Sequence, residues 1–389
     1  MKRIDGPRAC TKNELSEVIA LVDGALREGV DQSVFSDYPL VYLDKNLDNI
    51  RILKVDGELA AVVPVLPRHV VMDGCQFTIG TISPTATAPH HRMQGYGLQC
   101  VKSCLEVMNR MGCDLSVLWT MARTFPFYEK AGYQAVRSMG WLYRCFGRDA
   151  RLFQNRREII VQLNPDTNDY IDSIRMMHEK EVYGVLRAPE EYPFLFRLPK
   201  MKTLVALQRN VPVAYLTVSN AVNKPGLIEA GGDELAVETL LNRALLEKGE
   251  GHLDAYGYLT ETVLGNLLHR KLPQRRQSFG AAGVPGAMMI RINNVQTFMQ
   301  KLAKCLQKKT GFSPELSMDI TDAEQSVRLH FSRGRVQEGD YKLSHHLEVS
   351  RRELVSMIFG ATSDHPSCVS AMFQNMLPWY FPIWILDMS

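Results

Sequence analysis

The spacing of apolar residues predicts alternating helices and strands over the first 150 residues. Residues 11–14 have capping-box spacing, and apolar positions then recur at helical intervals, so we predict a first helix over about 12–28. Asp56-Gly57 and Asp73-Gly74 are dipeptides that favour tight hairpins because both residues accept positive φ. Asp56-Gly57 lies between the apolar runs at 50–55 and 59–66, and Asp73-Gly74 lies between a third run at 70–72 and its continuation at 77–82. The pattern therefore predicts an antiparallel meander after the helix.

A glycine-containing loop follows a strand that ends near Ala88-Pro89. Apolar residues between 98 and 108 then form a helical stripe that stops at Gly112. Beyond it the pattern predicts a strand, a short helix and two closing strands, at 115–119, 125–131, 133–136 and 139–146.

The rest of the chain contains two further predicted domains. Residues 151–292 weakly repeat the first plan, with helical segments at 167–187, 234–248 and 260–270, and a Gly- and Pro-rich stretch precedes the exit strand 288–292. Residues 293–389 indicate a small third domain, whose apolar, aromatic tail at 377–389 is expected to dock rather than extend into water. We predict an α+β chain of three domains, 1–150, 151–292 and 293–389.

Composition narrows the classes of partner. The formal net charge of +3 gives no reason to expect nucleic acid or an anionic membrane, and no run of about 18 apolar residues occurs. We therefore predict a soluble, cytoplasmic protein. The eight cysteines include no Cys-x-x-Cys pair, which favours reduced, mostly buried thiols over disulfides or zinc.

Arg92-x-x-Gly95-x-Gly97 is the strongest candidate for a binding site. A loop that leads from a strand into a helix offers free backbone N–H groups and the positive end of the helix dipole, about +0.5 charge. Glycines let the backbone approach a phosphate, and an arginine adds positive charge. Because this motif directly follows a strand and precedes an amphipathic helix, it predicts an anion cradle. The second domain has no such motif.

Two stretches together resemble the GNAT superfamily of N-acetyltransferases. Residues 85–97, Thr-Ala-Thr-Ala-Pro-His-His-Arg-Met-Gln-Gly-Tyr-Gly, are similar to its cofactor loop. Residues 127–133, Phe-Tyr-Glu-Lys-Ala-Gly-Tyr, resemble its FYxxxGY element. The three-domain layout is similar to the Eis (enhanced intracellular survival) branch, in which a GNAT domain, a degenerate GNAT-like domain and a sterol-carrier-protein-like domain form one chain. The resemblance is strong over about 1–150 and rests on layout afterwards.

The resemblance implies acetyl-coenzyme A as cosubstrate and assigns the residues that would hold it. Strand residues would pair through their backbone with the pantetheine arm, and the loop would wrap the pyrophosphate. The strand residues are Thr85, Ala86 and Thr87, and the loop residues are Arg92, Met93, Gln94, Gly95, Tyr96, Gly97 and Leu98.

The resemblance makes Tyr128 the general acid. A phenol of pKa near 10 is protonated at neutral pH and can donate to the leaving thiolate of coenzyme A. An aromatic residue at this spacing is often only part of a core, but the FYxxxGY context favours catalysis. Tyr133 is interpreted as structural.

The general base is left open between several groups. In the Eis-like branch the carboxylate at the end of the chain enters the first domain's active site, usually behind an aromatic last residue. This chain ends in Ser389, and its aromatic anchors lie at least five residues earlier. The Ser389 carboxylate is our first choice, and Asp387, Asp37 or a water chain are the alternatives.

The remaining polar clusters have simpler interpretations, and we expect no metal. The pairs His90-His91 and His345-His346 would point to opposite faces of a strand and could not both bind one ion. The basic residues near Arg275-Arg276 indicate a solvated face.

The sequence thus predicts direct transfer of acetyl from acetyl-coenzyme A to a primary amine in a ternary complex. The family's hexamers imply a homo-oligomer. Acidic residues near the predicted pocket loops would allow a cationic acceptor, namely Asp31, Asp37, Glu190 and Glu191. The alternative is a non-catalytic sensor or carrier that binds coenzyme A or a lipid.

Overall fold

A computed structural model describes residues 2–29, 32–72, 74–136, 138–167, 169–221, 224–258, 261–280, 287–311, 315–321, 326–360 and 387. This part of the chain divides into two compact units. One contains residues up to 138 and from 280 to 360, and the other contains 139–279 together with Asp387. Mixed sheets flanked by helices confirm the α+β class predicted from the sequence.

The first unit is organised around the predicted meander. β2 (Ile50–Val55), β3 (Glu58–Met72) and β4 (Cys75–Ile82) are antiparallel neighbours. The sheet order is β1-β2-β3-β4-β6-β16-β7, and β5 pairs with β3. The bounds of the other strands are Ile4–Ala9 for β1, Ala86–Thr87 for β5, Leu115–Thr120 for β6, Gln134–Ala135 for β7 and Ala287–Ile292 for β16.

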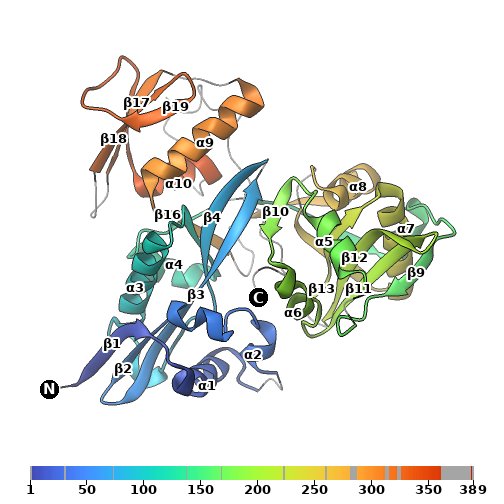
Figure 1. Cartoon of the computed structure of the whole chain (residues 1–389), viewed down its shortest axis with the longest axis horizontal. Helices are drawn as coiled ribbons and strands as arrows, with labels where there is room; N and C mark the ends of the chain where they lie inside the picture. The colour runs from blue at the N-terminus through green and yellow to red at the C-terminus, as the bar shows by residue number, and fades with distance from the viewer. Residues whose placement is uncertain are drawn as a thin grey trace. The chain divides into compact units, whose positions relative to one another are not determined.

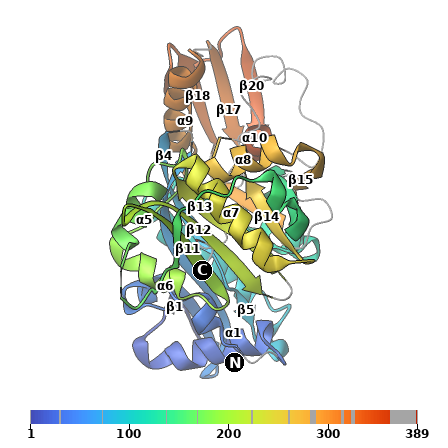
Figure 2. The same cartoon turned by 90° about the vertical axis from the view of Figure 1, so that its right-hand side faces the viewer.

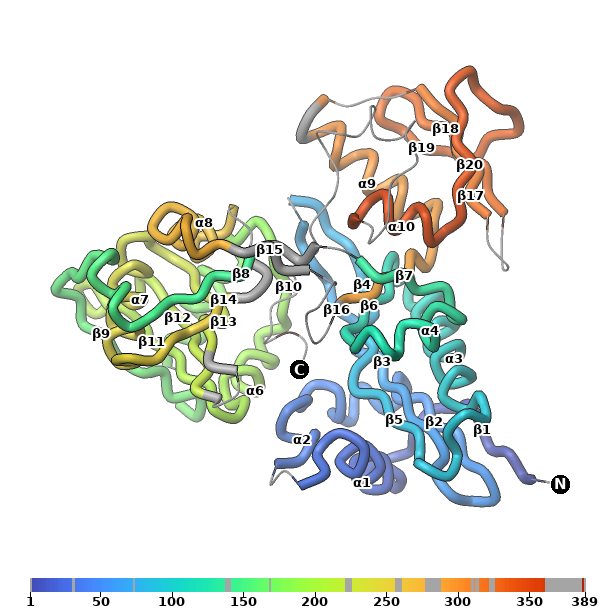
Figure 3. Tube along the Cα trace, turned by 180° about the vertical axis from the view of Figure 1, so that it is seen from behind, coloured from blue at the N-terminus to red at the C-terminus, as the bar shows by residue number. Residues whose placement is uncertain are grey.

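Helices cover both faces of this sheet, with α1 (Leu15–Leu26) on one side of β2 and β3 and α3 (Tyr96–Arg110) on the other (Figures 1 and 3). Cys100 and Cys104, four residues apart, share one face of α3, and their thiols donate to carbonyl oxygens of β3. They therefore belong to the core. The shorter helices are η1 (Lys12–Glu14), α2 (Val34–Asp37), η2 (Asp44–Asn49), η3 (Pro89–His91), η4 (Ala122–Thr124) and α4 (Phe125–Glu129).

The second unit contains a mixed sheet with the order β15-β8-β14-β13-β12-β11-β9. Its main helix α7 (Glu234–Lys248) has the predicted bounds and packs across β12 and β13 (Figure 2). The strands are β8 (Ser138–Phe146), β9 (Ile159–Gln162), β11 (Met201–Gln208), β12 (Val211–Ala221), β13 (Lys224–Gly232), β14 (His252–Tyr258) and β15 (Arg276–Gly280).

The segment predicted as helical at 167–187 is broken in the structure. It contains α5 (Ile171–His178) and then a strand, β10 (Tyr183–Leu186). The remaining helices of this unit are η5 (Gly147–Leu152), η6 (Pro189–Glu191), α6 (Tyr192–Phe196), α8 (Val263–Lys271) and η7 (Pro273–Arg275).

Sheet pairing places the domain borders differently from the predicted 150 and 292. β8, expected to close the first domain, pairs with β14 in the second unit's sheet. β16, expected as the exit strand of the second domain, pairs with β6 and β7 in the first sheet. Both strands are apolar enough to suit either sheet, so the pattern along the chain does not assign them.

The last described region belongs to the first unit. A sheet of order β19-β18-β17-β20 has α9 (Val295–Thr310) and α10 (Arg351–Phe359) against it (Figure 3). Lys301 of α9 donates to buried Asp114 at 2.6 Å, which ties this region to the first sheet. The strands are β17 (Leu316–Thr321), β18 (Ser326–Ser332), β19 (Arg335–Glu338) and β20 (His346–Ser350).

One pair of cysteines departs from the prediction of reduced thiols. Cys75 at the start of β4 and Cys305 in α9 form a disulfide, with 6.0 Å between their Cα atoms. They are 230 residues apart in sequence. Only the packing of α9 against β4 brings them together. The described free cysteines, Cys10, Cys100, Cys104, Cys113 and Cys145, are buried as predicted.

Among the residues that the structure describes, no helix has the length and apolar character needed to cross a membrane.

Candidate active site

An opening in the first sheet lies where β4 gives way to β5. β4 runs parallel to the start of β6, and the last pair in this register is Thr81 with Val117. The chain then shifts, and β5 pairs only with β3, through Ala61 with Thr87 and Val62 with Ala86, in the described part of the chain. β16 pairs with the whole of β6, but along the other edge of that strand, so it does not replace β4 beside the second half of β6. β5 and the end of β6 therefore separate, which leaves strand edges that an extended ligand can pair with.

The predicted loop lies between this opening and α3. After β5 the chain makes the short helix η3, and α3 begins at Tyr96 with Gly95 as its N-cap. The helix therefore directs the free N–H groups of its first turn toward the loop. Among the described helices of the first unit, only this one begins within an Arg-x-x-Gly-x-Gly motif, which makes its N-terminus the candidate anion site.

The two glycines of the motif serve different purposes. Gly95 has φ of +82°, a left-handed conformation that glycine adopts at little cost, and a Cβ there would meet nothing within 4 Å. A Cβ on Gly97 would instead lie 2.9 Å from the Thr87 hydroxyl oxygen and 3.4 Å from the Phe127 ring. Gly97 thus lets the first turn of α3 approach β5 and α4 closely, a reason that the sequence pattern did not reveal.

Positive charge gathers around the loop from two directions. Arg92 is exposed, and its Nε donates to the Thr87 carbonyl oxygen at 3.3 Å. Lys2, which the sequence interpretation missed, donates from Nζ to the Gln94 side-chain oxygen at 2.9 Å. Lys2 lies 92 residues before Gln94, and no local pattern connects them. Both cations favour a phosphate at this place.

Tyr128 lies beside the same opening, on the short helix α4. Its side chain is 8% exposed and belongs to the core cluster that also contains Tyr96 of the loop. Burial raises the pKa of the Tyr128 phenol, and the nearby Thr85 hydroxyl opposes this with a smaller effect. The phenol is therefore protonated at neutral pH and can act as a proton donor.

Tyr133 has a different environment, which agrees with its structural interpretation. It is completely buried, and its hydroxyl is hydrogen-bonded to that of Ser116. Burial raises the pKa of this phenol well above its usual value. The structure therefore brings Thr85, Thr87, Gly97 and Tyr128 into one neighbourhood and keeps Tyr133 in the core behind it.

The alternative bases are already engaged in ion pairs. Asp37 accepts hydrogen bonds from Arg27 and Gln32. Asp387 is fully buried in the second unit and accepts two hydrogen bonds of 2.7 Å from Arg187. The guanidinium groups already occupy these carboxylates, so an incoming amine would have to displace them.

The structure describes only some of the other residues that were predicted to belong to the site. Ser389 and Asp31 lie outside the described residues, and so does the aromatic tail before Asp387. Glu191 accepts from the Ala188 N–H at the start of η6, which indicates a capping role.

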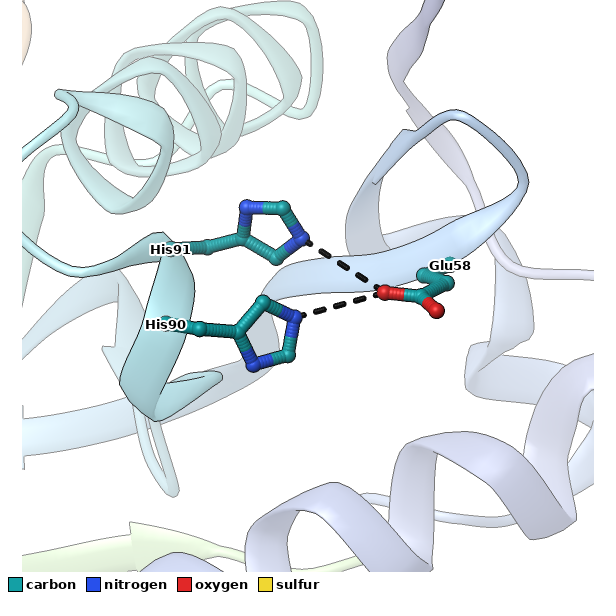
Figure 4. Close-up of side chains that lie close together, drawn as sticks. All are labelled: Glu58, His90 and His91. Carbon is teal, nitrogen blue, oxygen red and sulfur yellow. Dashed lines mark hydrogen bonds and ion pairs between the residues drawn. The ribbon is translucent and has the colours of Figure 1, made fainter.

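The two histidines before Arg92 are arranged differently from the prediction. They lie on η3 rather than on a strand, so their rings are adjacent, with centroids 4.2 Å apart. Both rings point to Glu58, as Figure 4 shows. The expectation that the pair would point to opposite faces was therefore wrong, because a helical turn replaces the extended backbone that it assumed.

Comparison with known proteins agrees with this geometry. Residues 7–136 match the acetyltransferase (GNAT) domain family. No curated protein matches the chain in sequence. The match covers the candidate site and the strands of the first sheet except β16, and it supports an acyltransferase enzyme whose donor is an acyl-coenzyme A.

Solved structures share the fold over nearly the whole chain. A probable N-acyltransferase from Enterococcus faecalis V583 has a TM-score of 0.72 at 15% identity, with 99% of each chain covered. A GCN5-related N-acetyltransferase from Anabaena variabilis has a TM-score of 0.71 at 14% identity, again with 99% of each chain covered. Eis1 from Mycobacterium abscessus has a TM-score of 0.65 at 15% identity, with 96% of each chain covered. At these identities the likeness establishes the fold.

Proposed function

We propose that the protein transfers acetyl from acetyl-coenzyme A to a primary amine in a ternary complex. The observation that carries the proposal is the opening beside β5, which has a helix N-terminus at one end and a protonated tyrosine beside it. An extended pantetheine arm would pair with Thr85, Ala86 and Thr87, and N–H groups there would polarise the thioester carbonyl. The pyrophosphate would lie on the loop from Arg92 to Leu98, next to the charges of Arg92 and Lys2.

Tyr128 is the proposed general acid. When the neutral amine attacks the acetyl carbon, the carbon–sulfur bond breaks and the sulfur leaves as a thiolate. Transfer of the phenolic proton to that sulfur completes the release of coenzyme A, and an effect of this kind is worth about 10²–10⁴ in rate. The raised pKa of Tyr128 supports this role, because the phenol then retains its proton at neutral pH.

The Ser389 carboxylate is the proposed general base. Asp387, two residues earlier, forms a buried ion pair with Arg187, and this contact near Ser389 is the observation that supports the proposal. We further propose an Eis-like arrangement in a cytoplasmic homo-oligomer, with a degenerate GNAT-like second domain and a sterol-carrier-protein-like third domain. Similarity of fold to Eis1 over 96% of each chain supports this arrangement.

The test measures release of free thiol from acetyl-coenzyme A with aminoglycosides, polyamines and lysine peptides as acceptors. Tyr128→Phe should reduce kcat by at least about tenfold while the affinity for acetyl-coenzyme A is retained. Tyr133→Phe is the matched control, because it removes a hydroxyl from the neighbouring core tyrosine and should leave kcat nearly unchanged. A chain without Met388 and Ser389 tests the base.

Two outcomes would change the proposal. If acetyl-coenzyme A binds, no amine is acetylated and Tyr128→Phe changes nothing, the protein is a coenzyme A-binding sensor or carrier rather than an enzyme. If the wild type is active but the shortened chain retains its full kcat, another group or a water chain accepts the proton from the amine.

A further inference from the structure

Three side chains with metal-binding groups converge at the outer end of β3. Glu58 is the first residue of β3, and His90 and His91 form the end of η3. One carboxylate oxygen of Glu58 lies 3.3 Å from Nε2 of His90 and 4.0 Å from Nε2 of His91. Figure 4 shows both rings pointing to that oxygen.

Strand register explains why residues so far apart in sequence meet. Thr87 pairs with Ala61, and the Ala88 N–H donates to the Ala60 carbonyl oxygen at 2.9 Å. Because β5 is antiparallel to β3, each further residue in the chain moves one position back along β3. The chain then turns into η3, and His90 lies beside Glu58, which the Asp56-Gly57 turn places at the start of the strand.

A simple surface ion pair with Glu58 does not explain the environment of the His91 ring. His91 is 7% exposed, and neither ring nitrogen has a hydrogen-bond partner among the residues that the structure describes. An imidazole buried without a partner loses its hydrogen bonds to water, which costs free energy. Its Nε2 points to the Glu58 oxygen but lies beyond hydrogen-bonding distance from it. An ion bound between the two groups would satisfy this nitrogen.

We propose that Glu58, His90 and His91 bind one divalent transition-metal ion of the zinc type, with water in the remaining position. Zinc lies about 2.0–2.2 Å from nitrogen and oxygen ligands, so two ligands of a tetrahedral site are about 3.4 Å apart. The His90 to Glu58 distance already has this value, and the His91 to Glu58 distance needs to close by about 0.6 Å.

The charge of the group suits such an ion. Glu58 supplies one negative charge, and Asp56 lies near enough to act on His91 as well. A neutral imidazole is the form that binds a metal. Imidazole and carboxylate together favour zinc over magnesium or calcium, which prefer oxygen ligands alone.

A second group in the chain provides a matched comparison. Asp319, His346 and Glu348 also lie close enough to bind one ion. There, Asp319 accepts two hydrogen bonds from Arg328, and Glu348 accepts one from Lys342. An ion would have to displace these cations, so we expect the first group to bind more tightly. Glu58 and Glu348 are similarly exposed, at 73% and 67% of their side chains.

The experiment measures Zn²⁺ binding to the full-length, untagged chain after treatment with a chelator. Calorimetric titration should show one tight ion for the wild type and for Glu348→Gln. Glu58→Gln and His90→Gln should each weaken the affinity by about tenfold or more. Both changed residues are exposed, so these variants should fold. Titration with Co²⁺ gives a second measurement, since the visible absorption of a tetrahedral site should appear in the wild type and be lost in Glu58→Gln.

The opposite results would overturn the proposal. The proposal fails if the wild type does not bind Zn²⁺ at micromolar concentration, or if the wild type and Glu58→Gln bind Zn²⁺ with equal affinity. Loss of affinity in Glu348→Gln but not in Glu58→Gln would assign the ion to the other group. Binding should also raise the Tm of the wild type and of Glu348→Gln, but not of Glu58→Gln, because the ion links η3 to β3. None of these measurements depends on acetyl transfer.

Discussion

Replacement of Arg187 by methionine should strongly destabilise the second unit. The Arg187 side chain is completely buried between two carboxylates, those of Glu229 and Asp387. It donates four hydrogen bonds, two to each carboxylate, at distances of 2.6 to 3.0 Å. Methionine fills a similar volume but donates no hydrogen bond and carries no charge.

The cost follows from what the substitution leaves behind. Glu229 and Asp387 are 1% and 0% exposed, so water cannot replace the guanidinium. Removal of one partner from a buried ion pair costs about 3–5 kcal/mol, because an uncompensated charge remains in the interior. Two carboxylates share this arginine, so we expect Arg187→Met to fall in that range or above it. A loss of 3 kcal/mol corresponds to about a hundredfold change in the equilibrium constant for opening.

Hydrogen exchange measured by mass spectrometry is the suitable assay, since it reports opening segment by segment. Amides of β13, which carries Glu229, should exchange about a hundredfold faster or more in Arg187→Met. Arg197→Met is the matched control, because Arg197 pairs with Asp166 in the same unit while both side chains are largely exposed, at 46% and 74%. Its effect should stay below about 1 kcal/mol. Equal exchange rates in the two variants would refute the reasoning.

Three further predictions follow from individual contacts. Gly97→Ala should weaken coenzyme A binding measured by calorimetry, because its Cβ would collide with the Thr87 hydroxyl and push α3 away from β5. Gly80→Ala should lower the Tm, because its Cβ would lie 2.1 Å from the Met108 sulfur. Burial raises the pKa of Glu181 to about 7. The stability that its neutral form contributes is therefore present below the unfolded pKa of about 4.3 and is lost as the pH rises to about 7. Glu181→Gln should remove this loss. The free energy of unfolding of the variant, measured with denaturant at several pH values, should therefore rise relative to that of the wild type as the pH increases from about 4.3 to about 7.

Local sequence was a good guide where an element is defined by its own residues. The helix predicted at 234–248 agrees with α7 at both ends, and Asp56-Gly57 placed the first hairpin. β1 was missed because Gly6-Pro7 interrupts its pattern, and β10 was taken for helix because its four residues follow a helical stripe. Short strands depend on a partner strand for their stability, and the pattern along the chain does not contain that partner.

The sequence supplied the residues proposed for the candidate site, and the fold supplied their arrangement. The glycine loop and the FYxxxGY element identified the loop, Gly97 and Tyr128. Thr85 as a neighbour of the Tyr128 phenol, and Lys2 as a neighbour of Gln94, became visible only in the folded chain. The arrangement of His90 and His91 was mispredicted because a strand was assumed where a helical turn occurs.

The sequence by itself determined the α+β class, most helices, the meander and the loop, because periodicity and turn residues act over a few positions. Tertiary structure alone decided which sheet receives β8 and β16, and the meeting of Cys75 with Cys305. It also decided that Arg187 lies between Glu229 and Asp387. These contacts join residues tens to hundreds of positions apart, and their energy depends on burial and register that exist only after the chain has folded.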